Sequence, residues 1–158
     1  MSLVADRIEE LGLTLPEPMQ PPPGADFPFE RVRIHAGLAY VSGHGPVDGT
    51  TTLTRGRVGD DVGTEEAAEA ARQVALATLA SLTEVLGDLD RIESWVRAFG
   101  MVCCTPDFDA MPAVINGYTG LINDVWGDAG RHSRSAIGVA ALPFGWPVEV
   151  ESVVAIRR

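Results

Sequence analysis

Residues 132–156 read HSRSAIGVAALPFGWPVEVESVVAI. Two mostly apolar stretches, 134–141 and 148–156, flank a turn rich in Pro and Gly, so both are predicted to be strands. Glu149 and Glu151 stand two residues apart in the second strand and must face the same side of a sheet. So apolar a strand is expected at the centre of a sheet, where two carboxylates are costly unless they are paired or functional.

Arg134 opens the first of these strands. A guanidinium at the end of a strand can hold a carboxylate through two parallel hydrogen bonds, which makes Arg134 a candidate anion-binding residue. The residues alone leave other interpretations open. Arg134 can be an exposed residue at a strand end, and Glu149 and Glu151 can form ion pairs with a nearby arginine.

The rest of the chain predicts an α+β fold of one domain. Apolar residues at spacings of three and four give two helices one apolar face each, so both can lie on one side of a single sheet. Gly87 is predicted to end the first of them, and Pro112 requires a place in the first turn of the second. The elements predicted upstream of residue 132 are a short amphipathic helix at 4–11, a hairpin of 31–36 and 38–43, an edge strand near 53–58, a helix capped by Thr64, a strand at 92–104 and a helix opened by Thr105–Asp107.

The segment before residue 31 differs from the rest. Six prolines between residues 16 and 28 exclude a helix or a central strand there. We therefore expect residues 1–30 to form a short helix and a proline-rich arm, and residues 31–158 to form the single folded domain. Phe27 and Phe29 in the arm are candidates to line a cleft, while the alternative is a tether that only wraps the surface.

Composition excludes several classes of function. The 158 residues include 22 acidic and 12 basic ones, a net charge of −10 that argues against nucleic acid as the main ligand. Every basic residue is arginine, so neither a lysine Schiff base with pyridoxal phosphate nor a P-loop lysine is available. The three histidines lack the spacing of metal ligands, and Gly43-His44-Gly45 does not open a dinucleotide-binding fingerprint. No metal or cofactor is predicted, and His44 is expected to serve as a hydrogen-bonding residue of a loop.

The sequence also bears on the compartment. No apolar stretch approaches the roughly 20 residues of a membrane-spanning helix, and the acidic start MSLVADRIEELG lacks the basic and apolar parts of a signal peptide. Cys103 and Cys104 are adjacent, which is poor geometry for a disulfide framework. We expect a soluble, reduced, cytoplasmic protein that does not interact with membranes.

The stretch 132–156 resembles the C-terminal signature of the Rid family, the YjgF-like reactive intermediate deaminases, some of which carry the label endoribonuclease L-PSP. In that family Arg-Ser opens a strand, a Leu-Pro turn follows, and a strand with the pattern V-E-x-E comes next. LAYVSGHGPV (38–47) is similar to an early family strand that usually ends in Ser-Gly-Gln. The resemblance covers roughly residues 26–156.

This resemblance implies a chorismate-mutase-like fold, with a mixed sheet, two helices on one face and the last strand inserted between earlier strands. It implies a homotrimer whose sites are clefts between subunits. Arg134 would hold the carboxylate of a small ligand, Glu149 would activate water and Asn116 would help to line the cleft. The remaining residues expected to bind substrate are Phe27, Phe29, Gly43 and Ser135.

The function implied is hydrolysis of enamines and imines such as 2-aminoacrylate to a 2-keto acid and ammonia. One alternative is a trimer that binds a small carboxylate through Arg134 without catalysis, and another is an endoribonuclease, which the net charge opposes. Phe27 and Phe29 occupy the stretch where the better-known branch of the family has a tyrosine, and His44 replaces the usual glutamine. Ala136 stands where a cysteine or another small residue is common. These departures indicate a modified cleft that prefers a larger or more apolar imine.

Overall fold

The computed structural model describes residues 2–157. The first residue of the predicted segment 1–30, Met1, and the last residue of the predicted domain 31–158, Arg158, lie outside the described residues. The elements in chain order are α1 (Leu3–Glu10), β1 (Val32–His35), β2 (Leu38–His44), β3 (Val47–Asp48), β4 (Thr51–Thr52), α2 (Thr64–Leu86), η1 (Leu89–Arg91), β5 (Ile92–Cys103), α3 (Met111–Trp126), η2 (Gly127–Gly130), β6 (Ser133–Val139), η3 (Pro143–Gly145) and β7 (Val148–Ile156).

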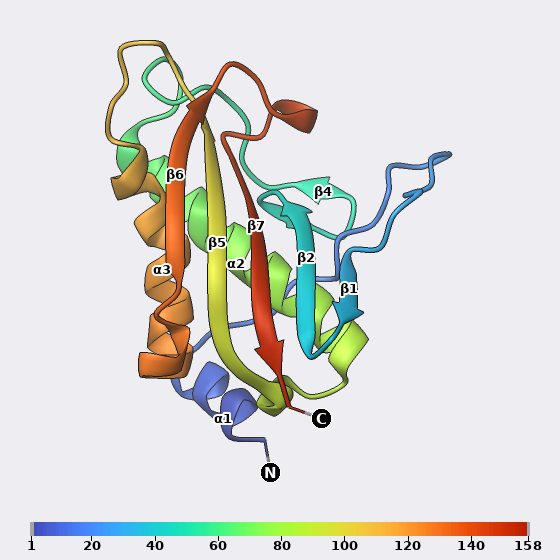
Figure 1. Cartoon of the computed structure of the whole chain (residues 1–158). Helices are drawn as coiled ribbons and strands as arrows, with labels where there is room; N and C mark the ends of the chain where they lie inside the picture. The colour runs from blue at the N-terminus through green and yellow to red at the C-terminus, as the bar shows by residue number, and fades with distance from the viewer. Residues whose placement is uncertain (1, 158) are drawn as a thin grey trace.

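Five strands form the main sheet in the order β1-β2-β7-β5-β6, and β3 pairs with β4 in a small separate hairpin (Figure 1). β6 runs parallel to β5, while the other neighbouring pairs are antiparallel. The last strand, β7, therefore lies between β2 and β5 and does not pair with β6. This arrangement confirms the expected mixed sheet, the α+β class and the central place of the second apolar strand.

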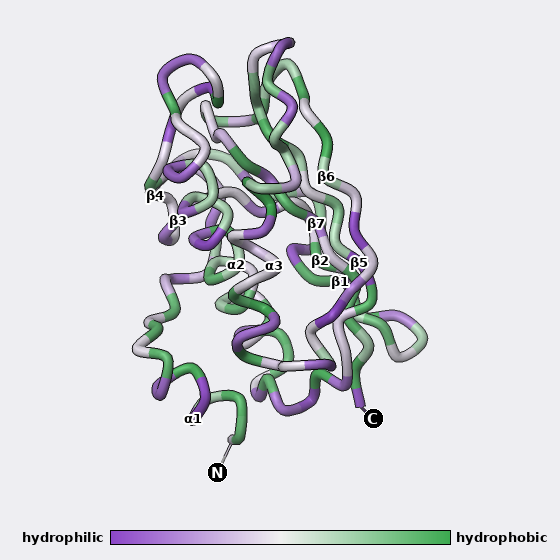
Figure 2. Tube along the Cα trace, turned by 90° about the vertical axis from the view of Figure 1, so that its left-hand side faces the viewer, coloured by the Kyte–Doolittle hydropathy of each residue, from purple (hydrophilic) through white to green (hydrophobic). Residues whose placement is uncertain are grey.

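Two helices cover one face of the sheet, with α2 over β2 and β7 and α3 over β5 and β6. Figure 2 shows the layers from the side, with α2 and α3 to one side of the strands. Along β7 the side chains of Val148, Val150 and Val154 are buried on the helix side. Glu149 and Glu151 alternate with them and point to the uncovered face, which confirms the prediction that both face the same side.

The helix pair is packed closely enough to require glycine. A Cβ atom added to Gly117 of α3 would lie 1.9 Å from the carbonyl oxygen of Ala68 in α2. Beside this contact the buried Tyr118 hydroxyl and the Ser152 hydroxyl of β7 are hydrogen bonded at 2.7 Å. The alanine-rich sequence of α2 permits this approach because alanine has the smallest side chain that still favours a helix.

Two predicted helix starts are wrong. Thr64 is the first residue of α2 and not its cap, because Gly63 holds the cap position without a side-chain hydrogen bond. The second helix begins at Met111 rather than at Thr105–Asp107, with Pro112 in its first turn as required. Thr105 instead donates its backbone N–H to the Val58 carbonyl at 3.0 Å, which holds this stretch in a loop. Gly87 ends α2 as predicted.

The predicted edge strand near 53–58 is also absent. Its place is taken by β3 and β4, which pair Val47 with Thr52 and Asp48 with Thr51. Gly49 lies in the turn with a φ of +57°, a conformation that glycine adopts without strain. The sequence pattern missed this hairpin because two-residue strands are too short to show alternation.

Hydrogen bonds at several places fasten the N-terminal segment to the domain. The Asp90 carboxylate accepts the backbone N–H groups of Leu3 and Val4, both at 2.8 Å, and so anchors the start of α1. Farther along, the backbone N–H of Gly49 donates a hydrogen bond to the carbonyl of Glu17 at 3.0 Å. The segment then loops out beyond β1 (Figure 1). None of the helices among the described residues has the length and apolar character that crossing a bilayer demands.

Candidate functional site

Glu149 lies at the start of β7 with its side chain half-buried on the uncovered side of the sheet. Its carboxylate rests against Gly43 of β2, where an added Cβ atom would lie 2.2 Å from Oε1. The register of β2 on β7 shifts between Val41 and His44, so Gly43 sits in a bulge beside the carboxylate. Burial, with the charge of nearby Glu151 adding to it, raises the pKa of Glu149 above its ordinary value.

The residues that follow Gly43 explain the Gly43-His44-Gly45 sequence. A Cβ atom on Gly45 would lie 2.2 Å from the Trp146 ring, so the second glycine makes room for that indole. His44 points into the core, where Nδ1 lies 2.7 Å from the Ser42 carbonyl and Nε2 lies 2.8 Å from the Ser81 hydroxyl. The carbonyl can only accept, so Nδ1 carries the hydrogen and Nε2 accepts from Ser81. Burial lowers the pKa of His44 to about 4, and the ring is neutral at pH 7.

A cavity of about 540 Å³ opens beside the Glu149 carboxylate. That volume lies within the range of about 300–1,000 Å³ typical of small-molecule sites. Its walls come from the proline-rich arm, the end of β2, the β3–β4 hairpin and η3. Its aromatic side chains are Phe27 and Phe29, stacked with ring centroids 4.9 Å apart, and Phe144 and Trp146, with centroids 5.2 Å apart.

Two charged side chains line this cavity among the described residues, Glu149 and Arg55. Arg55 is exposed and donates from Nη1 to the Phe144 carbonyl at 2.5 Å. Trp146 donates from its indole Nε1 to the Thr52 hydroxyl at 3.2 Å, which orients the ring. The cavity is therefore apolar, with one carboxylate and one guanidinium at defined places.

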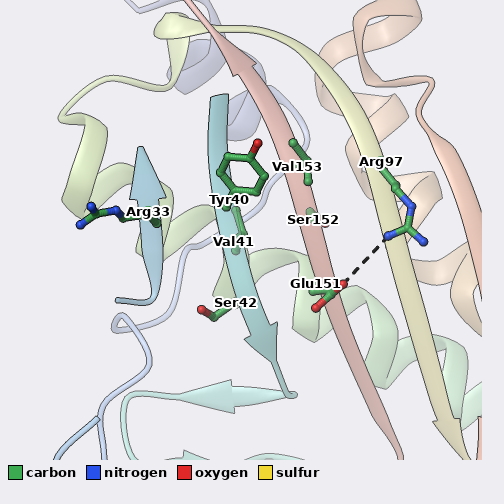
Figure 3. A pocket seen from close by; sticks show the side chains of 8 residues that line it. All are labelled: Arg33, Tyr40, Val41, Ser42, Arg97, Glu151, Ser152 and Val153. Atoms are coloured by element: carbon green, nitrogen blue, oxygen red, sulfur yellow. Dashed lines mark ion pairs between the residues drawn. The ribbon is translucent and has the colours of Figure 1, made fainter. Parts of the chain in front are cut away.

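Glu151 has a different environment from Glu149. Its carboxylate lies 4.0 Å from Nη1 of Arg97 on β5, above a second, smaller hollow of about 230 Å³ on the uncovered face (Figure 3). Figure 3 shows the two side chains pointing toward one another, with Tyr40 nearby on β2. The sequence left open that both glutamates form ion pairs with arginine, and the structure shows such a pair for Glu151. Within residues 2–157 no arginine or histidine pairs with Glu149.

Arg134 lies on the edge strand β6 and turns toward α3. Nη1 donates to the Asn116 side-chain oxygen at 2.8 Å and to the Thr119 hydroxyl at 3.1 Å, and Nη2 donates to the Pro112 carbonyl at 3.4 Å. A guanidinium has five hydrogens, so the Nε hydrogen and one Nη2 hydrogen have no partner among the described residues. The half-buried Arg134 is thus held in position by one helix and keeps donors free for a ligand.

His132 supports this arrangement from behind. Its Nδ1 lies 2.7 Å from the Gly130 carbonyl, and its Nε2 lies 3.1 Å from the Thr119 hydroxyl. The hydrogen therefore sits on Nδ1, and Thr119 donates to Nε2 while it accepts from Arg134. Burial, with the charge of Arg134 also contributing, lowers the pKa of His132 and favours the neutral ring that this chain of hydrogen bonds needs.

The predicted site residues fall into two groups in one chain. Arg134 pairs with Ala98, which is buried under the helices, whereas Glu149 pairs with Met101, whose side chain points to the uncovered face. The Arg134 and Glu149 side chains therefore lie on opposite faces of the sheet. Phe27, Phe29, Gly43 and Glu149 gather at the aromatic cavity, while Asn116 joins Arg134. Ser135 is exposed and faces away from Arg134, because neighbouring residues of a strand alternate.

Several residues of these two places were not singled out as site residues from the sequence. Arg55 and Thr119 carry no motif, and only the fold places them beside Phe144 and Arg134. Trp146 had a signal, since a large aromatic ring in a Pro- and Gly-rich turn is unusual. No cluster of three or more His, Cys, Asp or Glu side chains suited to a metal ion occurs within the described part of the chain.

Comparison with known proteins points to one family. A sequence profile described as "YjgF/chorismate mutase-like, putative endoribonuclease" matches residues 6–148. The protein TCP17 from Trypanosoma cruzi is 34% identical over 157 residues, which cover 98% of this chain and 95% of that protein.

Two solved structures are similar over almost the whole chain. Protein Atu1372 from Agrobacterium tumefaciens, described as of unknown function, is 36% identical with a TM-score of 0.88, covering 98% of this chain and 93% of that one. A structure from Shewanella oneidensis described as a "putative endoribonuclease" is 26% identical, also with a TM-score of 0.88, covering 97% and 99%. The similarity therefore includes most of the residues before residue 31 as well as the sheet and its helices.

Proposed function

The chain belongs to the YjgF/chorismate mutase-like family, and from that premise we propose that it hydrolyses imines or enamines that carry a carboxylate, at sites completed between subunits. The observation that carries this proposal is Glu149. It is a half-buried carboxylate without an ion-pair partner among the described residues, held against Gly43 beside a cavity of ligand size. A desolvated carboxylate with a raised pKa in a cleft is typical of a general base.

The site needs a second subunit because Arg134 and Glu149 occupy opposite faces of one sheet. Arg134 lies on the edge strand β6, whereas the cavity lies near the other edge, beside β2. Head-to-tail contacts that close into a ring bring one edge of a subunit against the other edge of its neighbour. We expect a homotrimer in which Arg134 of one subunit faces the Glu149 cavity of the next.

The uncovered sheet face is the second support for assembly. On this face 43% of the surface of Tyr40 and 40% of the surface of Ile137 are exposed. The opposite face is covered by α2 and α3 and forms the hydrophobic core. Packing three such faces around an axis removes this apolar surface from water, which is favourable. Light scattering at micromolar concentration measures the state directly, and a stable monomer would contradict the proposed site.

The chemistry requires only a positioned water and a fixed carboxylate. Arg134 holds the substrate carboxylate, and Glu149 accepts a proton from the water that adds to the imine carbon. The imine reacts in its N-protonated form, so this addition gives a neutral carbinolamine. The carbinolamine takes the proton from Glu149 on its nitrogen, the C–N bond breaks and a carbonyl forms, and the hydroxyl proton leaves with the ammonia as ammonium. An enamine first gains a proton on carbon to become the imine. The net reaction consumes one water and yields a 2-keto acid and ammonia, with no change in oxidation state.

The test compares Glu149→Gln with Glu151→Gln, which changes the same charge two residues along the same strand. The imine is generated in place by oxidation of an amino acid, and ammonia and keto acid are measured. Glu149→Gln should lower turnover by about 10²-fold or more, because general base catalysis contributes roughly 10²–10⁴-fold. Glu151→Gln should keep most of it, and both variants should assemble like the wild type. Loss of assembly with unchanged turnover per assembled site would instead assign both glutamates to contacts between subunits.

Arg134→Lys tests the other half of the site. Lysine keeps the charge but loses the planar fork, so affinity for a 2-keto acid should fall roughly tenfold to a hundredfold in calorimetry. Equal affinity of the two proteins would remove Arg134 from the ligand site. Binding that depends on Arg134 without any turnover would identify a carboxylate-binding protein in place of a hydrolase. RNA cleavage that survives both Glu149→Gln and Arg134→Lys would indicate a separate nuclease activity.

A further inference from the structure

Phe144 has a backbone conformation that a bulky residue rarely adopts. Its φ and ψ are +55° and +19°, in the left-handed region that favours glycine. Its ring is 49% exposed, so burial in the core does not explain the conformation. A strained residue that gains nothing from the core is more often held for a function.

Specific contacts hold Phe144 in place. Arg55 donates to its carbonyl oxygen, and the ring lies 5.2 Å from that of Trp146, which is itself fixed by its hydrogen bond to Thr52. Gly45 supplies the space for the indole. The outcome of these contacts is a phenyl ring turned toward the cavity beside Glu149.

The arm supplies a second aromatic wall to the same cavity. Phe27 and Phe29 stack on one another, and Phe29 leaves 50% of its surface exposed. Two pairs of rings, from segments more than a hundred residues apart in the chain, thus line one hollow of about 540 Å³. The imine of alanine carries only a methyl group as its side chain and would leave most of this hollow empty.

We infer that the cavity is the side-chain pocket of the site and takes a planar aromatic group, so that the substrates are imines or enamines of aromatic 2-amino acids. The inference rests on the proposed function for the imine and carboxylate end of the ligand. The pocket supplies ring faces and edges, against which an aromatic ligand packs in stacked or edge-to-face geometry. Arg55 stands at its rim and can also donate to a polar group on the ligand ring.

The experiment measures binding of two product-like probes, phenylpyruvate and pyruvate, by calorimetry on the full chain. Burial of a phenyl group should make phenylpyruvate bind at least about tenfold tighter than pyruvate. Phe144→Gly should reduce this preference about threefold or more. The matched control is Leu53→Ala, because Leu53 is similarly exposed at 47% and lines a different cavity.

Thermal unfolding gives a second readout for Phe144→Gly. Glycine adopts a φ of +55° without strain, so this variant should unfold at the same temperature as the wild type or a higher one while it loses the preference for phenylpyruvate. A lower unfolding temperature with an unchanged preference would mean that Phe144 only supports the loop, and would overturn the inference.

The remaining outcomes separate this inference from the proposed function. Equal affinity for the two probes, or no binding of either, overturns the aromatic pocket. The proposed hydrolysis of small imines is then tested only by the turnover of the Glu149→Gln variant. An equal effect of Phe144→Gly and Leu53→Ala on the preference overturns it as well. Tight phenylpyruvate binding that depends on Phe144, without hydrolysis of the imine made from phenylalanine, supports the pocket but overturns the inferred aromatic substrates. If small imines are not hydrolysed either, the proposed hydrolase is refuted as well.

Discussion

Replacing Gly117 by alanine should weaken the fold, although alanine is the better helix residue. In α3 the new methyl group would lie 1.9 Å from the Ala68 carbonyl oxygen of α2. An ordinary C···O contact is about 3.3 Å, so the helices must separate locally by at least about 1.4 Å. The atoms it meets are backbone, which no side-chain rotation can move aside. Overpacking of this kind costs about 1–3 kcal/mol.

Gly120 provides the control on the same helix. A Cβ atom there meets nothing within 4 Å, so Gly120→Ala should stabilise the protein by up to about 1 kcal/mol through helix propensity alone. Both variants gain this propensity, and the difference between their free energies of unfolding isolates the packing cost. We expect Gly117→Ala to be less stable than Gly120→Ala by about 1–3 kcal/mol, or about 2–12 °C in melting temperature for a chain of this size.

The assay is thermal and chemical denaturation of both variants at one protein concentration, because assembly makes the midpoint depend on concentration. Binding of a 2-keto acid is measured in parallel. Asn116 and Thr119 flank Gly117 and hold Arg134, so a displaced α3 should weaken carboxylate binding in Gly117→Ala. Equal stability of the two alanine variants would refute the reasoning, since it would show that the helices yield without cost.

Three further predictions concern polar side chains. The unfolded chain protonates His44 near pH 6.5 and the folded chain only at about 4, so the free energy of unfolding should fall as the pH drops between these values, by about 1.4 kcal/mol per pH unit. His44→Gln should remove that part of the pH dependence in chemical denaturation, and an unchanged slope would contradict the assignment. Gly43→Ala should displace the flexible Glu149 carboxylate, lowering imine turnover about tenfold or more with little change in melting temperature, and normal turnover would show that the position of the carboxylate does not matter. Tyr118→Phe leaves the Ser152 hydroxyl buried without its partner and should lower the free energy of unfolding by about 1–3 kcal/mol, measured by denaturation. The double variant Tyr118→Phe with Ser152→Ala should recover a part of this loss. If it recovers none, the hydrogen bond is not the cause.

The apolar pattern was sufficient for the layers of the fold but insufficient for its loops. The apolar run of β7 and the periodicity of α2 identified both elements, because burial imposes an apolar pattern on the sequence. The start of α3 was predicted too early, since Thr105 is held by a backbone hydrogen bond to Val58, a residue 47 positions away. The hairpin of β3 and β4 likewise left no pattern.

The sequence by itself singled out the residues that we propose carry the chemistry, and the tertiary structure alone decided where they face. Gly43 was identified only through the resemblance to the Rid family, whereas Arg134 and Glu149 stand out because charge in an apolar strand is costly without a reason. Their separation onto two faces of the sheet depends on the insertion of β7 between β2 and β5, which sets the register of Glu149 against Met101. The aromatic cavity is likewise a product of tertiary contacts, because its walls are joined only when the arm, the β3–β4 hairpin and η3 meet in space. Sequence records the local cost of a side chain, whereas the direction in which that side chain points is settled by partners distant in the chain.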